Sequence, residues 1–104
     1  MPARLIADSG STKTEWCLLN DNKKKRINTQ GLSPYFLSGN QMKEILKKEL
    51  TPKIKNAEPA DIFFYGTGCS NPANVKIVKD ALKSVFPGSR VMVDHDLMGA
   101  AKSL

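Results

Sequence analysis

The spacing of apolar residues changes once along this chain, and that change constrains the fold more than any other feature of the sequence. Up to Gly31 the chain consists of short apolar runs separated by polar turns, a pattern typical of strands joined as hairpins. From Asn40 onward, apolar residues recur at helical spacing in two segments, and a short apolar run follows each of them. Hairpins that lead into alternating helices and strands predict a mixed sheet with helices on its faces.

The expected elements follow the order β-β-β-α-β-α-β-α. They are strands over 4–8, 15–20 and 25–30, a helix capped by Asn40 and stopped by Pro52, a strand over 61–65, a helix that begins at Asn71-Pro72 and stops at Pro87-Gly88, a strand over 90–94, and a helix over 97–104. The first, fourth and fifth strands would run parallel, so the loops 9–14, 66–70 and 94–96 would meet at one edge of the sheet. Ligands bind at this edge in open α/β sheets.

Composition narrows the class of protein. The 104 residues suffice for one small domain, and the net charge of +6 comes from dispersed basic residues, including a Lys23–Arg26 run expected at a turn. Aromatic residues make up 7% of the chain and do not alternate with basic ones, so we expect no nucleic-acid partner. No apolar run approaches the roughly 20 residues that cross a bilayer, and Asp8 comes too early for a signal peptide. The isolated Cys17 and Cys69 indicate reduced thiols in a cytoplasmic protein without a membrane partner.

The segment from Asp8 to Thr14 carries most of the chemistry in the sequence. Its Lys13-Thr14 pair matches the end of a Walker P-loop, but Thr12 and Ala7 stand where that loop needs glycine, and a strand is expected after it instead of a helix. A turn of small residues can still present backbone N–H groups and hydroxyls to phosphate oxygens, with Lys13 as a point charge. A carboxylate such as Asp8 suits Mg²⁺, often through water. The alternative is an ordinary hairpin turn with a surface aspartate.

Four segments together resemble a known family. They are Leu5–Trp16, Thr29–Phe36, Tyr65–Cys69 and Val93–Ala101. In these segments the chain resembles the BadF/BadG/BcrA/BcrD ATPase family of the actin/hexokinase/Hsp70 superfold, particularly its bacterial N-acetylglucosamine kinase-like members. The resemblance implies an α/β, ribonuclease H-like (actin-like ATPase) subdomain whose five-stranded mixed sheet has the order 3-2-1-4-5.

The resemblance also implies ATP and Mg²⁺ as cofactors, with a role for each matching residue. Asp8 would organise the magnesium ion. Asp96 would be the general base that removes a proton from a sugar hydroxyl as it attacks the γ-phosphate, and Asp94 competes for this role. The other implied contacts are to the β- and γ-phosphates from Gly10, Ser11, Thr12, Lys13 and Thr14, and to the substrate side of the cleft from Ser33, Gly66, Thr67 and Gly68.

The substrate implied is N-acetylglucosamine or a related amino sugar. Kinase-like relatives usually have asparagine where this chain has Ser33, and asparagine offers a donor and an acceptor at longer reach than serine. This departure leaves the identity of the sugar open.

Nucleotide sites of this superfold lie between two lobes. The resemblance therefore implies that residues 1–104 are the N-terminal lobe of a sugar kinase and that a C-terminal lobe, absent from this sequence, supplies the second phosphate loop. We expect the chain alone to bind ATP weakly and to show no turnover. A homodimer is a further possibility that the sequence does not decide.

Three other functions remain on sequence grounds. The chain could belong to an activator ATPase of a 2-hydroxyacyl-CoA dehydratase, or to a noncatalytic sensor module with a degenerate site. It could also be a ribonuclease H-like nuclease, whose two metals need clustered carboxylates such as Asp8, Asp61 and Asp94. However, Asp61 begins its expected strand and should lie at the opposite edge of the sheet.

Overall fold

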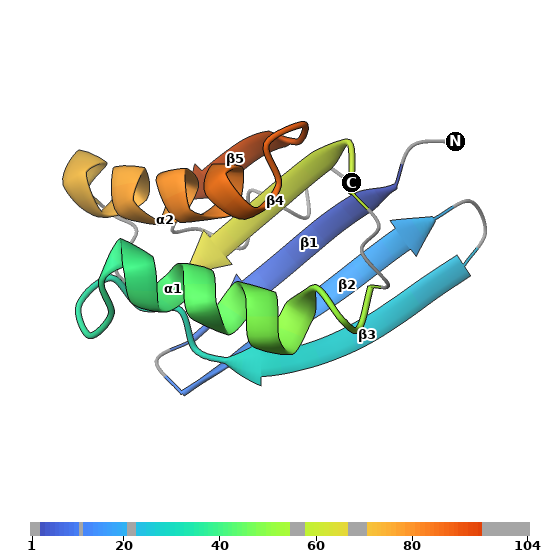
Figure 1. Ribbon diagram of the computed structural model, residues 1–104, viewed down its shortest axis with the longest axis horizontal. Helices are drawn as coiled ribbons and strands as arrows, with labels where there is room; N and C mark the ends of the chain where they lie inside the picture. The colour runs from blue at the N-terminus through green and yellow to red at the C-terminus, as the bar shows by residue number, and fades with distance from the viewer. Residues whose placement is uncertain (1–2, 11, 21–22, 55–57, 67–70, 95–104) are drawn as a thin grey trace.

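Five strands form one mixed sheet in the order β3-β2-β1-β4-β5, which confirms the expected fold class and strand order. The computed structural model describes residues 3–10, 12–20, 23–54, 58–66 and 71–94. Strands β1 (Arg4–Ser9), β2 (Lys13–Asn20) and β3 (Lys23–Gln30) pair antiparallel as a meander. Strands β4 (Asp61–Gly66) and β5 (Arg90–Asp94) extend the sheet parallel to β1. The sheet therefore has an antiparallel part, formed by β1, β2 and β3, and a parallel part, in which β4 and β5 follow β1 (Figure 1).

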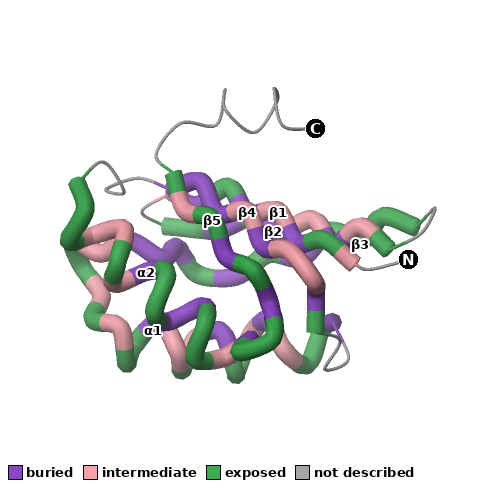
Figure 2. Tube along the Cα trace, turned by 90° about the horizontal axis from the view of Figure 1, so that it is seen from above, coloured by how far each residue is buried: buried purple, intermediate pink, exposed green. Residues whose placement is uncertain are grey.

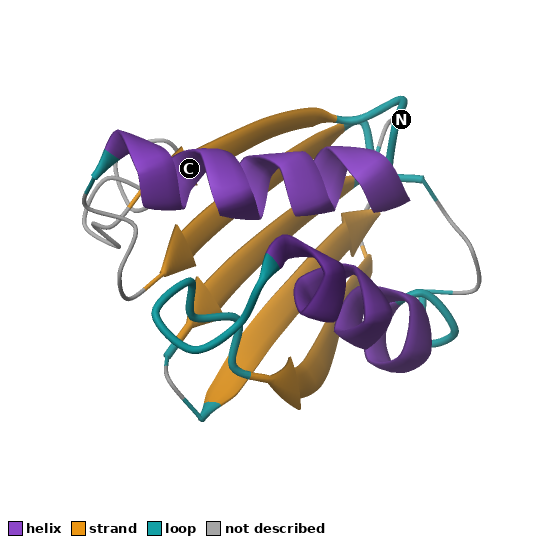
Figure 3. Ribbon diagram, turned by 60° about the vertical axis from the view of Figure 1, so that its left-hand side comes forward, coloured by secondary structure: helices purple, strands orange, loops and turns teal. Residues whose placement is uncertain are grey.

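Helices cover one face of this sheet. Helix α1 (Gly39–Ile45), the π-helical turn η1 (Leu46–Leu50) and helix α2 (Pro72–Val85) connect the later strands. Figures 1 and 3 show α1 and α2 against the same face. Within the residues that the structure describes, no helix is long and apolar enough to cross a membrane.

The core lies between the sheet and this helix layer (Figure 2). Alternate residues of each strand point into it, because side chains of a strand alternate between the two faces. The rings of Trp16 and Phe64 meet there, with centroids 6.0 Å apart. The core residues are Leu5, Ala7, Trp16, Leu18, Ile27, Ile62, Phe64 and Val91 from the strands, Met42, Leu46, Leu50, Val78, Ala81 and Leu82 from the helices, and Leu32, Ile54 and Phe86 from the segments between them.

Two strands begin earlier than expected. The loop predicted at 9–14 is shorter, because Ser9 still pairs with Thr14, and Lys13 pairs with Gln30. The basic run Lys23–Arg26 forms the first half of β3 and is not part of a turn. This run lies on an edge strand, where lysine is common because it discourages pairing with other chains.

The ends of the helices follow capping chemistry. Ser38 caps α1, and not Asn40 as predicted: Ser38 Oγ accepts from the Gln41 N–H, and Gln41 Oε1 accepts from the Ser38 N–H at 2.8 Å. This reciprocal pair satisfies two helix N–H groups at once, which a cap at Asn40 would leave open. Asn71 caps α2 ahead of Pro72, as predicted. The predicted helix over 97–104 lies outside the described residues.

Candidate active site

The carboxyl ends of three parallel strands form one edge of the sheet. In the strand register Asp8 lies beside Tyr65, Tyr65 lies beside Asp94, and Ser9 lies beside Gly66. The expected convergence of Asp8, Gly66 and the end of β5 at one edge is therefore observed. Asp8 is exposed and alternates with the core-facing Ala7 and Ser9, which places its carboxylate on the face of the sheet opposite the helices.

A tight turn follows Asp8 and Ser9 and connects β1 to β2. It is closed by the Gly10 N–H, which donates to the Lys13 carbonyl oxygen at 2.8 Å. Among the described residues beyond its two chain neighbours, a Cβ atom added at Gly10 would come within 4 Å of that oxygen alone, at 3.7 Å. Packing within the chain therefore does not demand glycine here. Glycine at this position permits close approach of another group to the backbone.

Buried hydroxyl groups support this turn from below. Ser9 Oγ lies 2.7 Å from Thr14 Oγ1, and both side chains are buried. Thr14 Oγ1 also donates to the carbonyl oxygen of Gln30, and the Leu32 N–H donates to Ser9 Oγ, each at 3.0 Å. These contacts join the end of β1, the start of β2 and the segment after β3. Because the Thr14 hydroxyl is already paired within the core, we assign it to the support of the turn and not to a direct phosphate contact.

This network continues through β2 and β3. Trp16 Nε1 donates to Thr29 Oγ1 at 2.9 Å, and Thr29 Oγ1 donates to the same Gln30 carbonyl oxygen at 3.0 Å. Among the described residues, no buried side-chain nitrogen or oxygen lacks a hydrogen-bond partner. A fully paired network of this kind holds the backbone in one arrangement. Sequence analysis did not identify Ser9 as part of the site, although its core-facing place at the end of a strand was a usable signal.

The charged side chains near the turn lie on the face of the sheet that is opposite the helices. Lys13 Nζ lies 3.5 Å from Glu15 Oε1, and both side chains are mostly exposed. Glu15 is the register partner of Asp8. A hollow of about 340 Å³ adjoins these groups, and it is lined by Ile6, Asp8, Glu15, Trp16, Cys17, Arg26 and Asn28.

The segment after β3 also approaches this end of the sheet, through the bond between Leu32 and Ser9. Ser33, the predicted substrate contact, is buried, and its Oγ accepts from the Tyr35 N–H at 3.4 Å. Its carbonyl oxygen accepts from the N–H groups of Phe36 and Leu37. Tyr35 and Phe36 are 62% and 73% exposed, so this turn presents these two aromatic residues outward. Sequence analysis did not select either of them.

Asp61 lies at the far edge of the sheet, as the position of its strand predicted. Its carboxylate pairs with Arg90 Nε at 3.0 Å and with Arg4 Nε at 3.9 Å. Asp8 and Asp61 therefore do not share a site, which argues against the nuclease arrangement. Within the described ranges, no group of three or more His, Cys, Asp and Glu residues could hold a metal ion. Four predicted site residues lie outside those ranges, namely Ser11, Thr67, Gly68 and Asp96.

Comparison with known proteins places this geometry in a structural class. No family model and no curated protein matches the chain. A solved structure from Porphyromonas gingivalis, provisionally named an N-acetylglucosamine kinase, matches 96% of the chain with a TM-score of 0.81 and 38% sequence identity. The chain has a kinase-like ATPase fold. The resemblance to N-acetylglucosamine kinase-like proteins, expected from four sequence segments, is thereby confirmed.

Two further structures share the kinase-like ATPase fold at low identity. YeaZ from Pseudomonas aeruginosa matches 99% of the chain with a TM-score of 0.57 and 18% identity, and the chain covers 48% of it. An uncharacterised protein with similarity to peptidase YeaZ from Pseudomonas aeruginosa matches 99% of the chain with a TM-score of 0.57 and 19% identity, and the chain covers 47% of it. The chain spans 36% of the Porphyromonas gingivalis protein, about a third of its length. The chain therefore matches less than half of each of these three proteins.

Proposed function

We propose that this chain is the N-terminal, phosphate-binding lobe of an ATP-dependent sugar kinase. One observation carries the proposal: Asp8 is exposed at the carboxyl edge of the sheet, separated by one residue from a turn closed by Gly10 and Lys13. The 38% identity to a protein provisionally named an N-acetylglucosamine kinase supports a kinase over other ATPases of this fold. The remaining lobe would supply the other side of the nucleotide site.

The residues at this edge fit Mg²⁺ and a triphosphate. Mg²⁺ keeps several of its waters and takes only one or two carboxylates together with phosphate oxygens, so a single exposed Asp8 is sufficient from this lobe. The open backbone at Gly10, the exposed Thr12 and the ammonium group of Lys13 would face the β- and γ-phosphates. When bound, Mg²⁺ would neutralise the charge that develops on the transferred phosphoryl group.

The proposed substrate is N-acetylglucosamine or a related amino sugar. Asp96 would act as the general base two residues beyond the end of β5, and Asp94, the last residue of β5, is the alternative base. Gly66 borders the cleft next to Ser9, and Ser11, Thr67 and Gly68 would complete its lining. Because Ser33 is buried, we propose that it shapes this side of the cleft while the exposed rings of Tyr35 and Phe36 contact the sugar or the second lobe.

We further propose a cytoplasmic location, supported by the free thiol of Cys17. The partners in this proposal are ATP, the sugar and the C-terminal lobe, with neither nucleic acid nor membrane. A second copy of the chain, in a homodimer, is a possible further partner. The lysines are distributed over β3, η1 and α2. This distribution supports the proposal that the positive charge belongs to a solvent-exposed surface and not to a nucleic-acid site.

The test measures ADP release by the full-length protein with ATP, Mg²⁺ and a panel of hexoses and amino sugars. We expect turnover with N-acetylglucosamine or a close relative, loss of activity in Asp8→Asn and in Asp96→Asn, and near-normal activity in Asp61→Asn at the far edge. Loss in Asp94→Asn with retention in Asp96→Asn would transfer the base role to Asp94. Sugar-independent hydrolysis together with bound iron would overturn the kinase in favour of the activator ATPase.

A further inference from the structure

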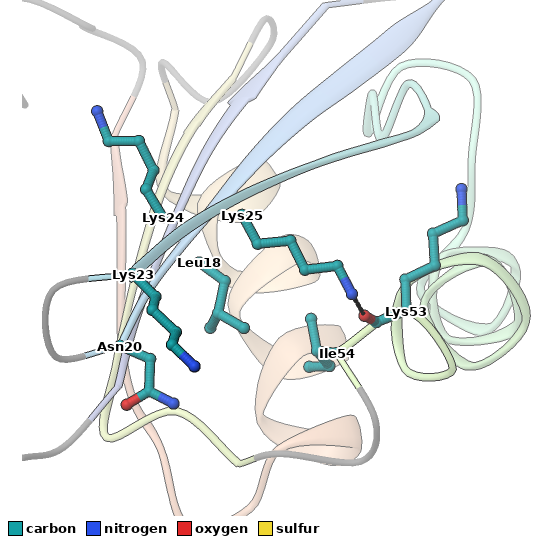
Figure 4. A pocket seen from close by; sticks show the side chains of 7 residues that line it. All are labelled: Leu18, Asn20, Lys23, Lys24, Lys25, Lys53 and Ile54. Atoms are coloured by element: carbon teal, nitrogen blue, oxygen red, sulfur yellow. Dashed lines mark hydrogen bonds between the residues drawn. The ribbon is translucent and has the colours of Figure 1, made fainter.

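A second cavity lies at the end of the β2–β3 hairpin remote from Asp8. Its volume is about 520 Å³, and it is lined by Leu18, Asn20, Lys23, Lys24, Lys25, Lys53 and Ile54 (Figure 4). Asp8 pairs with Glu15 in the strand register, and Asn20 lies five residues further along β2. At the rise of a strand, Glu15 and Asn20 are roughly 17 Å apart. The cavity is therefore separate from the proposed nucleotide site, and nothing in the proposed function uses it.

The lining combines cationic side chains with a small apolar floor. Lys23 and Lys25 are two residues apart on β3 and share the face that carries the buried Ile27. Lys25 Nζ donates to the carbonyl oxygen of Lys53, which fixes the Lys25 side chain across the cavity mouth. Figure 4 shows Lys23 and Lys25 extending beside Leu18 and Ile54, with Asn20 next to Lys23.

The charge of this lining is unbalanced. Among the described residues that line it, four of seven are lysines and none is a carboxylate. Figure 4 shows the ammonium groups of Lys24 and Lys53 directed away from Leu18 and Ile54, so Lys23 and Lys25 supply the charge next to this apolar floor. Like charges gathered around a concave surface raise the local concentration of anions, and a phosphate monoester close to −2 at neutral pH can pair with more than one ammonium group. The cavity volume lies in the range of small-molecule sites, and the part of its lining that the structure describes contains no aromatic side chain of the kind that a nucleic-acid platform would require.

We propose that this cavity binds a small organic phosphate. The phosphate group lies between the ammonium groups of Lys23 and Lys25, and the organic part rests on Leu18 and Ile54. The carboxamide of Asn20 offers a donor and an acceptor to hydroxyls of the ligand. This site is independent of the proposed kinase function, so the failure of either proposal leaves the other intact.

The test follows amide signals of the ¹⁵N-labelled 104-residue chain by NMR during titration with phenyl phosphate, inorganic phosphate and phenol. We expect phenyl phosphate to shift the signals of Leu18, Lys25 and Ile54, inorganic phosphate to shift the same signals with weaker affinity, and phenol to shift none. Equal affinity for inorganic phosphate, binding of phenol, or shifts confined to Asp8–Lys13 would each overturn the proposal.

Matched variants locate the charges that matter. The double substitution Lys23→Gln and Lys25→Gln should weaken phenyl phosphate binding by about tenfold, since it removes both ammonium contacts. The same charge removed by Lys76→Gln and Lys79→Gln on α2 should leave the affinity unchanged. Because Lys25 also contacts the Lys53 carbonyl, the single variant Lys23→Gln provides a second test, with about threefold weaker binding at an unchanged Tm. Unchanged affinity in both lysine variants of β3 would contradict the assignment.

Discussion

The hydroxyl oxygens of Ser9 and Thr14 lie 2.7 Å apart beneath the turn that follows Asp8. They hold the ends of β1 and β2 together and connect them to the backbone of Gln30 and Leu32. The turn therefore rests on a buried polar network, while its exposed side stays open. This arrangement separates residues that support the candidate site from residues that could contact a ligand.

The first prediction concerns the support of the turn. Thr14→Val keeps the shape of the side chain but removes the hydroxyl that pairs with Ser9 and Gln30, so the free energy of unfolding should fall by about 1–3 kcal/mol. Urea denaturation of the 104-residue chain measures this change. Thr12→Val is the control, since Thr12 is exposed in the same turn and should shift the free energy by at most about 0.5 kcal/mol. Equal effects of the two substitutions would show that the buried network does not stabilise the turn.

The second prediction compares two aspartates at opposite edges of the sheet. Asp61→Asn weakens the ion pairs with Arg90 and Arg4, and the cost should be below about 1 kcal/mol because both arginine side chains are largely exposed. Asp8→Asn should leave the free energy of unfolding nearly unchanged but reduce Mg²⁺-dependent ATP binding by the full-length protein. Isothermal titration with and without Mg²⁺ measures binding. Should Asp61→Asn impair that binding as much as Asp8→Asn, the candidate site would be placed at the wrong edge.

The third prediction concerns the start of α1. Ser38→Ala removes the side-chain oxygen that accepts from the Gln41 N–H but keeps the backbone N–H that donates to Gln41 Oε1, and it should cost about 1 kcal/mol. Ser84→Ala, on the exposed face of α2, should be neutral or slightly stabilising because alanine favours a helix interior. Thermal unfolding of both variants provides the comparison. A larger loss for Ser84→Ala would argue against the capping role of Ser38.

The fourth prediction concerns the helix-covered core. Leu82→Ala should lower the free energy of unfolding by about 2–5 kcal/mol, because Leu82 is completely buried between α2 and the sheet. Leu19→Ala, at a half-buried position on β2, should have a clearly smaller effect. Denaturant unfolding checks the pair, and similar losses at both positions would mean that the second face of the sheet is as tightly packed as the first.

The strand order could be predicted because it follows from general rules of connection. Short loops required an antiparallel meander up to Gln30, and right-handed crossovers placed β4 and β5 on the far side of β1. The start of β2 could not be located in the same way. Lys13 and Thr14 are polar, and they belong to the strand because Gln30 pairs with Lys13 while Thr29 and Ser9 pair with Thr14.

The candidate site was predictable only in outline. The position of Asp8 at the carboxyl edge followed from the order of the strands, and so did the position of Asp61 at the other edge. The burial of Ser33 and Thr14 was not foreseen, because the sequence does not say whether a hydroxyl bonds to the protein or to a ligand. The lysine-lined cavity likewise depends on contacts between segments that are distant in sequence. The Ser38 cap does not, because Ser38 and Gln41 form a local capping-box pattern that the sequence contains.

The central claim is that the turn after Asp8 holds a magnesium-bound triphosphate. Its most direct measurement adds Mn²⁺ and ATP to the ¹⁵N-labelled chain and records paramagnetic broadening, which detects weak binding through proximity to the ion. We expect strong broadening of the Asp8, Gly10 and Lys13 amide signals, and its loss in Asp8→Asn. Sharp signals at these three residues, in the presence of broadening elsewhere, would contradict it.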